Sequence, residues 1–120
     1  MRSPLDTVLS ALRAYEAKDR AAIEALIADD YRFTSPLDNG LDREAYLQIC
    51  WPGSATMSGV EVIHGTQAGN VAFVVYEANI AGKRVRNCEV HTVRGGRLVR
   101  TEVYFGWDVP HPVPPGEHRE

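Results

Sequence analysis

Residues 71–107 read VAFVVYEANIAGKRVRNCEVHTVRGGRLVRTEVYFGW. Apolar and polar side chains alternate through this stretch with the period of two that is typical of β-strands. Glycine-containing turn signals at 68–70, 81–83 and 95–96 separate four β-rich runs that begin near Val60. The pattern predicts an antiparallel meander of four long strands.

The residues before the meander have helical spacing instead. Ser3 is expected to cap a first helix, with Pro4 in its first turn and Asp6 completing a capping box. Apolar residues then recur at the spacing of one helical face. They are Leu5, Val8, Leu9, Leu12 and Tyr15.

The segment at 19–51 is expected to hold two more helices. Asp19 is a candidate N-cap for a helix that should end at the acidic pair at 29–30. A short strand at 31–35, a loop at 37–40 and a third helix at 42–51 are expected to follow. Three helices before a sheet predict an α+β domain in which the helices cover the concave face of a curved sheet, and the open end becomes a cavity.

Length and composition indicate one domain with a tail. The chain has 120 residues, 44% of them hydrophobic, which is enough for a single compact core. We assign residues 1–107 to that domain and residues 108–120 to a tail. Four prolines within 108–115 predict an extended or mobile segment there.

Charge and cysteine usage narrow the partners and the compartment. The net charge of −3 offers no broad basic surface, so we expect no nucleic-acid partner. Cys50 and Cys88 favour a reduced, intracellular protein over a disulfide framework. Charged residues interrupt the first twenty positions, so neither a signal peptide nor a membrane partner is expected. We therefore expect a cytoplasmic protein.

A candidate site lies on one face of the strand near residue 90. Asn87, Glu89 and His91 alternate with residues that point to the other face. An acid and a base that share an apolar concavity are candidates for proton transfer, with Asn87 as an orienting amide. The alternative is a buried Glu and His that satisfy each other or the backbone.

Neighbouring positions predict an apolar lining for the cavity. Thr101, Val103 and Phe105 are expected to face inward on the last strand, as are Val74, Tyr76 and Ala78 on an earlier one. Phe33 and Trp51 are expected near the mouth. Such a wall suits a small hydrophobic molecule, although most of these residues would also suit an ordinary core.

Other kinds of chemistry lack their motifs. The four histidines show no HExxH pattern or paired spacing with acids, so no metal is indicated. There is no GxSxG elbow and no phosphate-binding glycine loop. We expect no cofactor. An epoxide-hydrolase-like site would need an arginine between two acids, and the inward face of the strand bearing Glu89 offers none.

The chain resembles the superfamily of cone-shaped α+β barrels that includes nuclear transport factor 2, ketosteroid isomerase and the SnoaL-like polyketide cyclases. The resemblance covers residues 4–107. It is carried by Lys18-Asp19, the run at 23–30, Ser35-Pro36 and the closing strand at 99–107. It implies the fold of this superfamily and frequent dimers through the outer sheet face. Because isomerases, cyclases, hydrolases and non-catalytic proteins share the fold, it does not imply one activity.

The isomerase's catalytic residues carry over only in part. Ser35 stands where the resemblance places the general-base aspartate, so we treat Ser35 as a substrate-binding candidate. Asp38 is an alternative base or a plain turn residue. Tyr15 and Tyr46 stand near the isomerase's tyrosines, and either is a hydrogen-bond donor to a ligand or a core residue. The isomerase's protonated acid falls on Glu89 or on His91, depending on which turn anchors the alignment.

The opposite face of the sheet is expected to be charged. Arg84, Arg86, Arg94 and Arg100 share it with Glu77 and Glu102, which favours cross-strand ion pairs. This face, with Tyr104, is a candidate homodimer surface.

Two hypotheses about function remain open from the sequence. The first is an isomerase-like or cyclase-like enzyme in which Glu89 and His91 move a proton on a small apolar carbonyl or enol compound, while a tyrosine stabilises the oxyanion. The second is a ligand-binding or dimerisation module that has lost its base.

Overall fold

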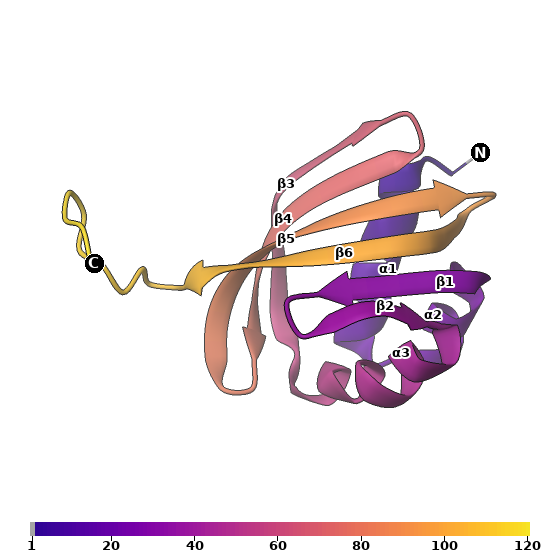
Figure 1. Cartoon of the computed structure of the whole chain (residues 1–120), viewed down its shortest axis with the longest axis horizontal. Helices are drawn as coiled ribbons and strands as arrows, with labels where there is room; N and C mark the ends of the chain where they lie inside the picture. Colours follow the sequence, from indigo (N-terminus) through magenta and orange to yellow (C-terminus); the bar gives the residue numbers. More distant parts are fainter. Residues whose placement is uncertain (1) are drawn as a thin grey trace.

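The computed structural model describes residues 2–120 and contains a mixed six-stranded sheet with helices packed on one side (Figure 1). The elements, in chain order, are α1 (Pro4–Ala17), α2 (Arg20–Leu26), β1 (Ile27–Ser35), β2 (Asp38–Asp42), α3 (Arg43–Ile49), the 3₁₀ helix η1 (Trp51–Thr56), β3 (Ser58–Ala68), β4 (Val71–Ile80), β5 (Lys83–Arg94) and β6 (Arg97–Asp108).

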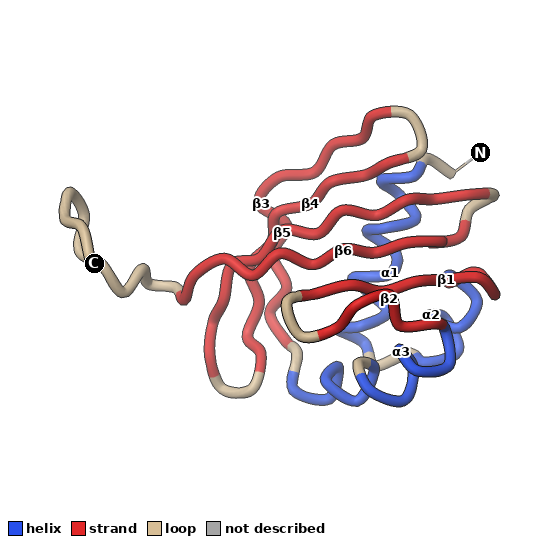
Figure 2. Tube along the Cα trace, viewed as in Figure 1, coloured by secondary structure: helices blue, strands red, loops and turns tan. Residues whose placement is uncertain are grey.

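The sheet has the strand order β2-β1-β6-β5-β4-β3 and does not close on itself. Strands β3 to β6 form the expected antiparallel meander, and β1 joins it by pairing in parallel with β6. Figure 2 shows β4 and β5 bending part-way along their length, which gives the sheet its curvature. The predicted α+β class, with helices over the concave face, is confirmed.

Side-chain caps fix where the helices begin. The Ser3 hydroxyl accepts the Asp6 N–H, and the Asp6 carboxylate accepts the Ser3 N–H, so the predicted capping box is present. Asp19 caps α2, also as predicted, and Asp42 caps α3. Such caps each stabilise a helix by roughly 0.5–2 kcal/mol.

The structure corrects three boundaries between 20 and 56. Helix α2 ends at Leu26 rather than at 29–30, because Ile27 already pairs with Leu98 of β6 and is buried. The predicted loop at 37–40 contributes to strand β2, which pairs with β1. Helix α3 ends at Ile49, and the next residues form η1 instead of continuing the helix.

Two β-bulges set the register between β5 and β6. Arg94 pairs with Arg97 across the Gly95-Gly96 turn, but further along His91 pairs with Thr101. The shift leaves Val99 as an extra residue on β6. A second shift leaves Gly106 unpaired, and its N–H donates to Asn87 Oδ1 at 3.2 Å. The bulges therefore decide which β6 side chains face the helices.

The core lies between the helices and the concave face, and aromatic rings fill much of it. Tyr46 contacts Tyr31 and Phe33 with ring centroids 5.0 Å apart in each case. Trp51 packs edge-on against Tyr15 at 4.9 Å. Within residues 2–120, no helix is both long enough and apolar enough to cross a membrane.

The tail leads away from the sheet (Figure 1). Residues 109–120 form neither helix nor strand. The ring of His111 lies 5.4 Å from that of Trp107, and the Val109 N–H donates to the Arg84 carbonyl. These contacts attach the start of the tail to the beginning of β5 and the end of β6.

Gly106 provides a test of the second bulge. A Cβ added at this position would collide with the backbone carbonyl oxygen of Arg86. We therefore expect Gly106→Ala to lower the free energy of unfolding by roughly 1–3 kcal/mol, measured by urea denaturation. The matched control is Gly53→Ala, where an added Cβ meets nothing within 4 Å. An equally stable Gly106→Ala variant would contradict the assigned bulge.

Candidate functional site

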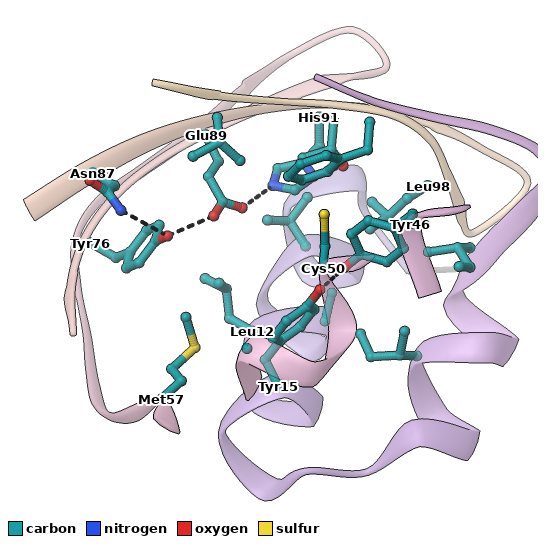
Figure 3. A pocket seen from close by; sticks show the side chains of 18 of the residues that line it. Leu12, Tyr15, Tyr46, Cys50, Met57, Tyr76, Asn87, Glu89, His91 and Leu98 are labelled. Atoms are coloured by element: carbon teal, nitrogen blue, oxygen red, sulfur yellow. Dashed lines mark hydrogen bonds and ion pairs between the residues drawn. The ribbon is translucent and has the colours of Figure 1, made fainter. Parts of the chain in front are cut away.

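A cavity of about 250 Å³ lies between the helices and the concave face of the sheet (Figure 3). Apolar side chains from α1, α2, β1 and the ends of β4 and β6 form most of its wall. The side chains with polar atoms are Tyr15, Tyr31, Tyr46, Cys50, Tyr76, Asn87, Glu89, His91 and Thr101.

Glu89 is held by two hydrogen bonds in this largely apolar space. Its Oε1 lies 2.8 Å from His91 Nε2, and its Oε2 accepts the Tyr76 hydroxyl at 2.7 Å. The Glu89 side chain is 13% exposed and that of His91 is 5% exposed. Charged groups are costly to bury unless donors compensate them, and here both carboxylate oxygens have one.

The second nitrogen of His91 has a partner as well. Nδ1 lies 2.9 Å from the hydroxyl oxygen of Thr101, which is 2% exposed. A His91 ring that donates from Nε2 to the Glu89 carboxylate can accept the Thr101 hydroxyl proton at Nδ1. All three groups then have a consistent donor or acceptor role.

Tyr76 is orientated by Asn87. The Asn87 amide group donates to the Tyr76 oxygen at 3.5 Å, while its own oxygen accepts the Gly106 N–H. Burial, and then the charge of Glu89, raises the pKa of Tyr76. Its hydroxyl therefore keeps its proton and remains a donor to Glu89 at neutral pH.

Across the cavity, the hydroxyl groups of Tyr15 and Tyr46 form a hydrogen bond with each other (Figure 3). Burial, followed by the charge of Glu89, raises the pKa of Tyr46. Two hydroxyl protons are present and one is used in the mutual bond. The other is available to a ligand oxygen.

Cys50 also borders the cavity but is not an activated nucleophile. Burial, with a smaller contribution from Asp38, raises the pKa of the Cys50 thiol to about 11. At neutral pH the group is almost entirely a thiol, and thiols are poor nucleophiles compared with thiolates.

The sequence profile of the SnoaL-like domain matches residues 8–101 of this chain. The chain belongs to the SnoaL-like family. The resemblance to the nuclear transport factor 2-like superfamily is thereby confirmed.

Solved structures share the fold of this SnoaL-like protein at low sequence identity. An NTF2-like protein from Cytophaga hutchinsonii is 19% identical, with 88% of this chain and 92% of that chain covered and a TM-score of 0.78. A putative ketosteroid isomerase from Kribbella flavida is 18% identical, with 98% of this chain and 84% of that chain covered and a TM-score of 0.76. A putative polyketide cyclase from Streptomyces antibioticus is 22% identical, with 83% of this chain and 89% of that chain covered and a TM-score of 0.68. A search of curated proteins found no significant match.

Most of the residues selected from the sequence line the cavity of the SnoaL-like domain. They are Tyr15, Phe33, Tyr46, Tyr76, Asn87, Glu89, His91, Thr101, Val103 and Phe105. Three others do not. Ser35 donates to Asp38 at 2.8 Å and accepts the Leu37 N–H, so both Ser35 and Asp38 serve the β1–β2 turn. Trp51 is buried against Tyr15 instead of standing at the mouth.

Several lining residues were not singled out from the sequence as site residues. Leu12 and Ile23 belong to apolar helical stripes, and Cys50 and Met57 border the cavity from either side of η1. A helical stripe looks the same in sequence whether it faces packed core or an empty space. Cavity and core therefore could not be separated before the structure.

Two other kinds of site, a metal site and an epoxide-hydrolase-like site, can be checked among the described residues. Among residues 2–120, no group of three or more His, Cys, Asp or Glu side chains is arranged to hold a metal ion. The cavity lining formed by these residues contains neither arginine nor lysine. An acid-arginine-acid arrangement of the epoxide-hydrolase kind is therefore not formed within the described cavity.

Proposed function

We propose that this SnoaL-like protein binds a small apolar carbonyl or enol compound in the cavity and moves a proton on it. The observation that carries the proposal is the Glu89 carboxylate, fixed by Tyr76 and His91 within a largely apolar wall. A base that is fixed in position and shielded from water is suited to proton abstraction next to a carbonyl group.

Glu89 acts as the base in this proposal. Each carboxylate oxygen accepts one hydrogen bond and has a further lone pair available. Glu89 takes a proton from the carbon next to the substrate carbonyl, and the electron pair of that C–H bond moves to give an enolate. The protonated Glu89 then returns the proton to a different carbon or to the oxygen, so the net change is an isomerisation.

The tyrosine pair stabilises the developing negative charge. Tyr15 and Tyr46 lie across the cavity from Glu89 (Figure 3), and their one uncommitted hydroxyl proton is available to an enolate oxygen. A donor that is already in place when charge develops lowers the barrier more than mobile water does.

His91 and Tyr76 position the base in this scheme. Both donate to Glu89, and each is itself fixed by another side chain, Thr101 in one case and Asn87 in the other. Two fixed donors hold the carboxylate in one rotamer, so the reacting oxygen does not need to reorganise.

A ligand-binding module without chemistry is the second candidate. It is favoured by Ser35, which occupies the position where the resemblance places the isomerase base and which serves a turn here. The two candidates share the cavity and differ in whether Glu89 removes a proton from the bound ligand.

Deuterium exchange distinguishes the two candidates. We expect the protein to accelerate exchange of the α-protons of apolar cyclic ketones in D₂O, followed by ¹H NMR. Glu89→Gln should slow this exchange by roughly 10²–10⁴-fold, because the amide cannot accept the proton.

The matched control is Glu102→Gln, a substitution of the same type on the outer face of the sheet, where Glu102 bonds Tyr104. This variant should exchange at the wild-type rate. Ketones that bind in the cavity without any accelerated exchange would leave the protein as a binding module. Wild-type exchange by Glu89→Gln would exclude Glu89 as the base.

We also propose that a second copy of the chain packs against the outer face of the sheet. Val75, Cys88 and Tyr104 lie side by side there on β4, β5 and β6, next to the pair formed by Phe73 and Val90. Phe73 is 38% exposed and Tyr104 53% exposed. Exposed apolar rows of this kind mark interaction surfaces.

Charged residues border this apolar surface. Arg84 and Arg86 both form ion pairs with Glu77, at 3.5 and 3.6 Å, as the sequence predicted for this face. A surface that carries both signs of charge around an apolar centre can match itself across a two-fold axis.

Sedimentation velocity tests the dimer. The wild-type protein should sediment at twice the chain mass of 13.3 kDa, and Phe73→Asp should sediment as the monomer. Leu37→Asp is the control, because Leu37 is an exposed apolar residue in the β1–β2 turn and not on this face. A wild-type monomer, or a Phe73→Asp dimer, would contradict the proposal.

A further inference from the structure

A second recess adjoins the inner cavity at the open end of the sheet. This recess has a volume of about 380 Å³ and lies over the β4–β5 hairpin and the end of β6. It shares Ile80, Asn87 and Phe105 with the inner cavity. These three side chains therefore stand between the two spaces and border both.

Phe105 stands at this junction with its ring partly in solvent. It is paired with Asn87, on the same face of the sheet as Glu89, and it is 55% exposed. Val85 and Ile80 add apolar surface on the same side. An exposed phenylalanine beside other apolar side chains, at the mouth of a cavity, is a surface that a ligand can cover.

Because Gly106 is an extra residue on β6, Phe105 and Trp107 do not share one face of the strand. Trp107 pairs with Arg86, and its ring lies 5.9 Å from the Arg86 guanidinium carbon. Arg86 in turn pairs with Glu77 on the outer face. Trp107 contacts Arg86 and borders the recess alone, whereas Phe105 borders both the recess and the inner cavity.

Volume and charge indicate what occupies the recess. At about 250 Å³ the inner cavity is smaller than the roughly 300–1,000 Å³ that is usual for ligand pockets. The charged residues of the recess are Lys83 and Asp108, which have opposite signs. Their charges offset each other, so the recess does not favour a charged group.

We propose that the ligand is elongated and uncharged, with its reacting carbonyl in the inner cavity and a second apolar ring or chain in the recess against Phe105. This inference rests on the proposed function for the position of the carbonyl. It makes Phe105 a residue that determines specificity for ligand length.

A pair of ligands that differ by one ring tests the inference. Acetophenone is the short ligand and 4-phenylacetophenone the long one, with affinities measured by ligand-observed NMR titration. The wild-type protein should bind the long ligand at least tenfold more tightly. Phe105→Ala should weaken binding of the long ligand at least fivefold and of the short ligand less than twofold, and Phe105→Leu should fall between.

Leu37→Ala is the control, because Leu37 is an exposed apolar residue in the β1–β2 turn that borders neither the cavity nor the recess. It should leave both affinities unchanged. Equal affinities for the two ligands would overturn the inference and leave the proposed function unaffected. The same holds for a Phe105→Ala variant that still binds the long ligand as much more tightly than the short one as the wild type does. Tighter binding of the long ligand without accelerated deuterium exchange would contradict the proposed proton transfer and support ligand binding in the recess. Binding of neither ketone would overturn both.

Discussion

The site depends on one constraint, which is that the Glu89 carboxylate needs donors in a cavity with few polar groups. Tyr76 from β4 and His91 from β5 supply them, and Thr101 from β6 completes the set through His91. The three central strands of the sheet must therefore keep one relative register for the carboxylate to be satisfied. Loss of either donor would leave a buried charge partly uncompensated, which is far more costly than loss of an exposed hydrogen bond.

The two bulges on β6 turn this constraint into a shaped cavity. The extra residue Val99 moves Thr101 opposite His91, where its hydroxyl meets Nδ1. The extra residue Gly106 brings a backbone N–H to Asn87, which orientates Tyr76. The same bulge leaves Phe105 at the mouth of the cavity and places Trp107 beside Arg86. Bulges near active sites commonly redirect side chains in this way.

Sequence patterns predicted the element types and the inward face, because period and turn chemistry are local properties. The two-residue turn that pairs Ile80 with Lys83 also places Tyr76 diagonally opposite Glu89, a relation that strand counting can recover. The bulges were not predictable, since pairing with the neighbouring strand, and not local alternation, decides which residue is left unpaired. The end of α2 was missed for a similar reason. Ile27 continues an apolar helical stripe in sequence, but its pairing with β6 makes it a strand residue.

The hydrogen-bond chain runs from Thr101 through His91 to the Glu89 carboxylate when Nε2 carries the ring proton. The most direct test is the long-range ¹H–¹⁵N spectrum of the histidine rings at neutral pH, with the His91 signals assigned by comparison with His91→Gln. We expect a proton on Nε2 and a hydrogen-bonded, unprotonated Nδ1. A proton on Nδ1 would contradict it, because Thr101 could not then donate to the ring and the direction of the hydrogen-bond chain would be wrong.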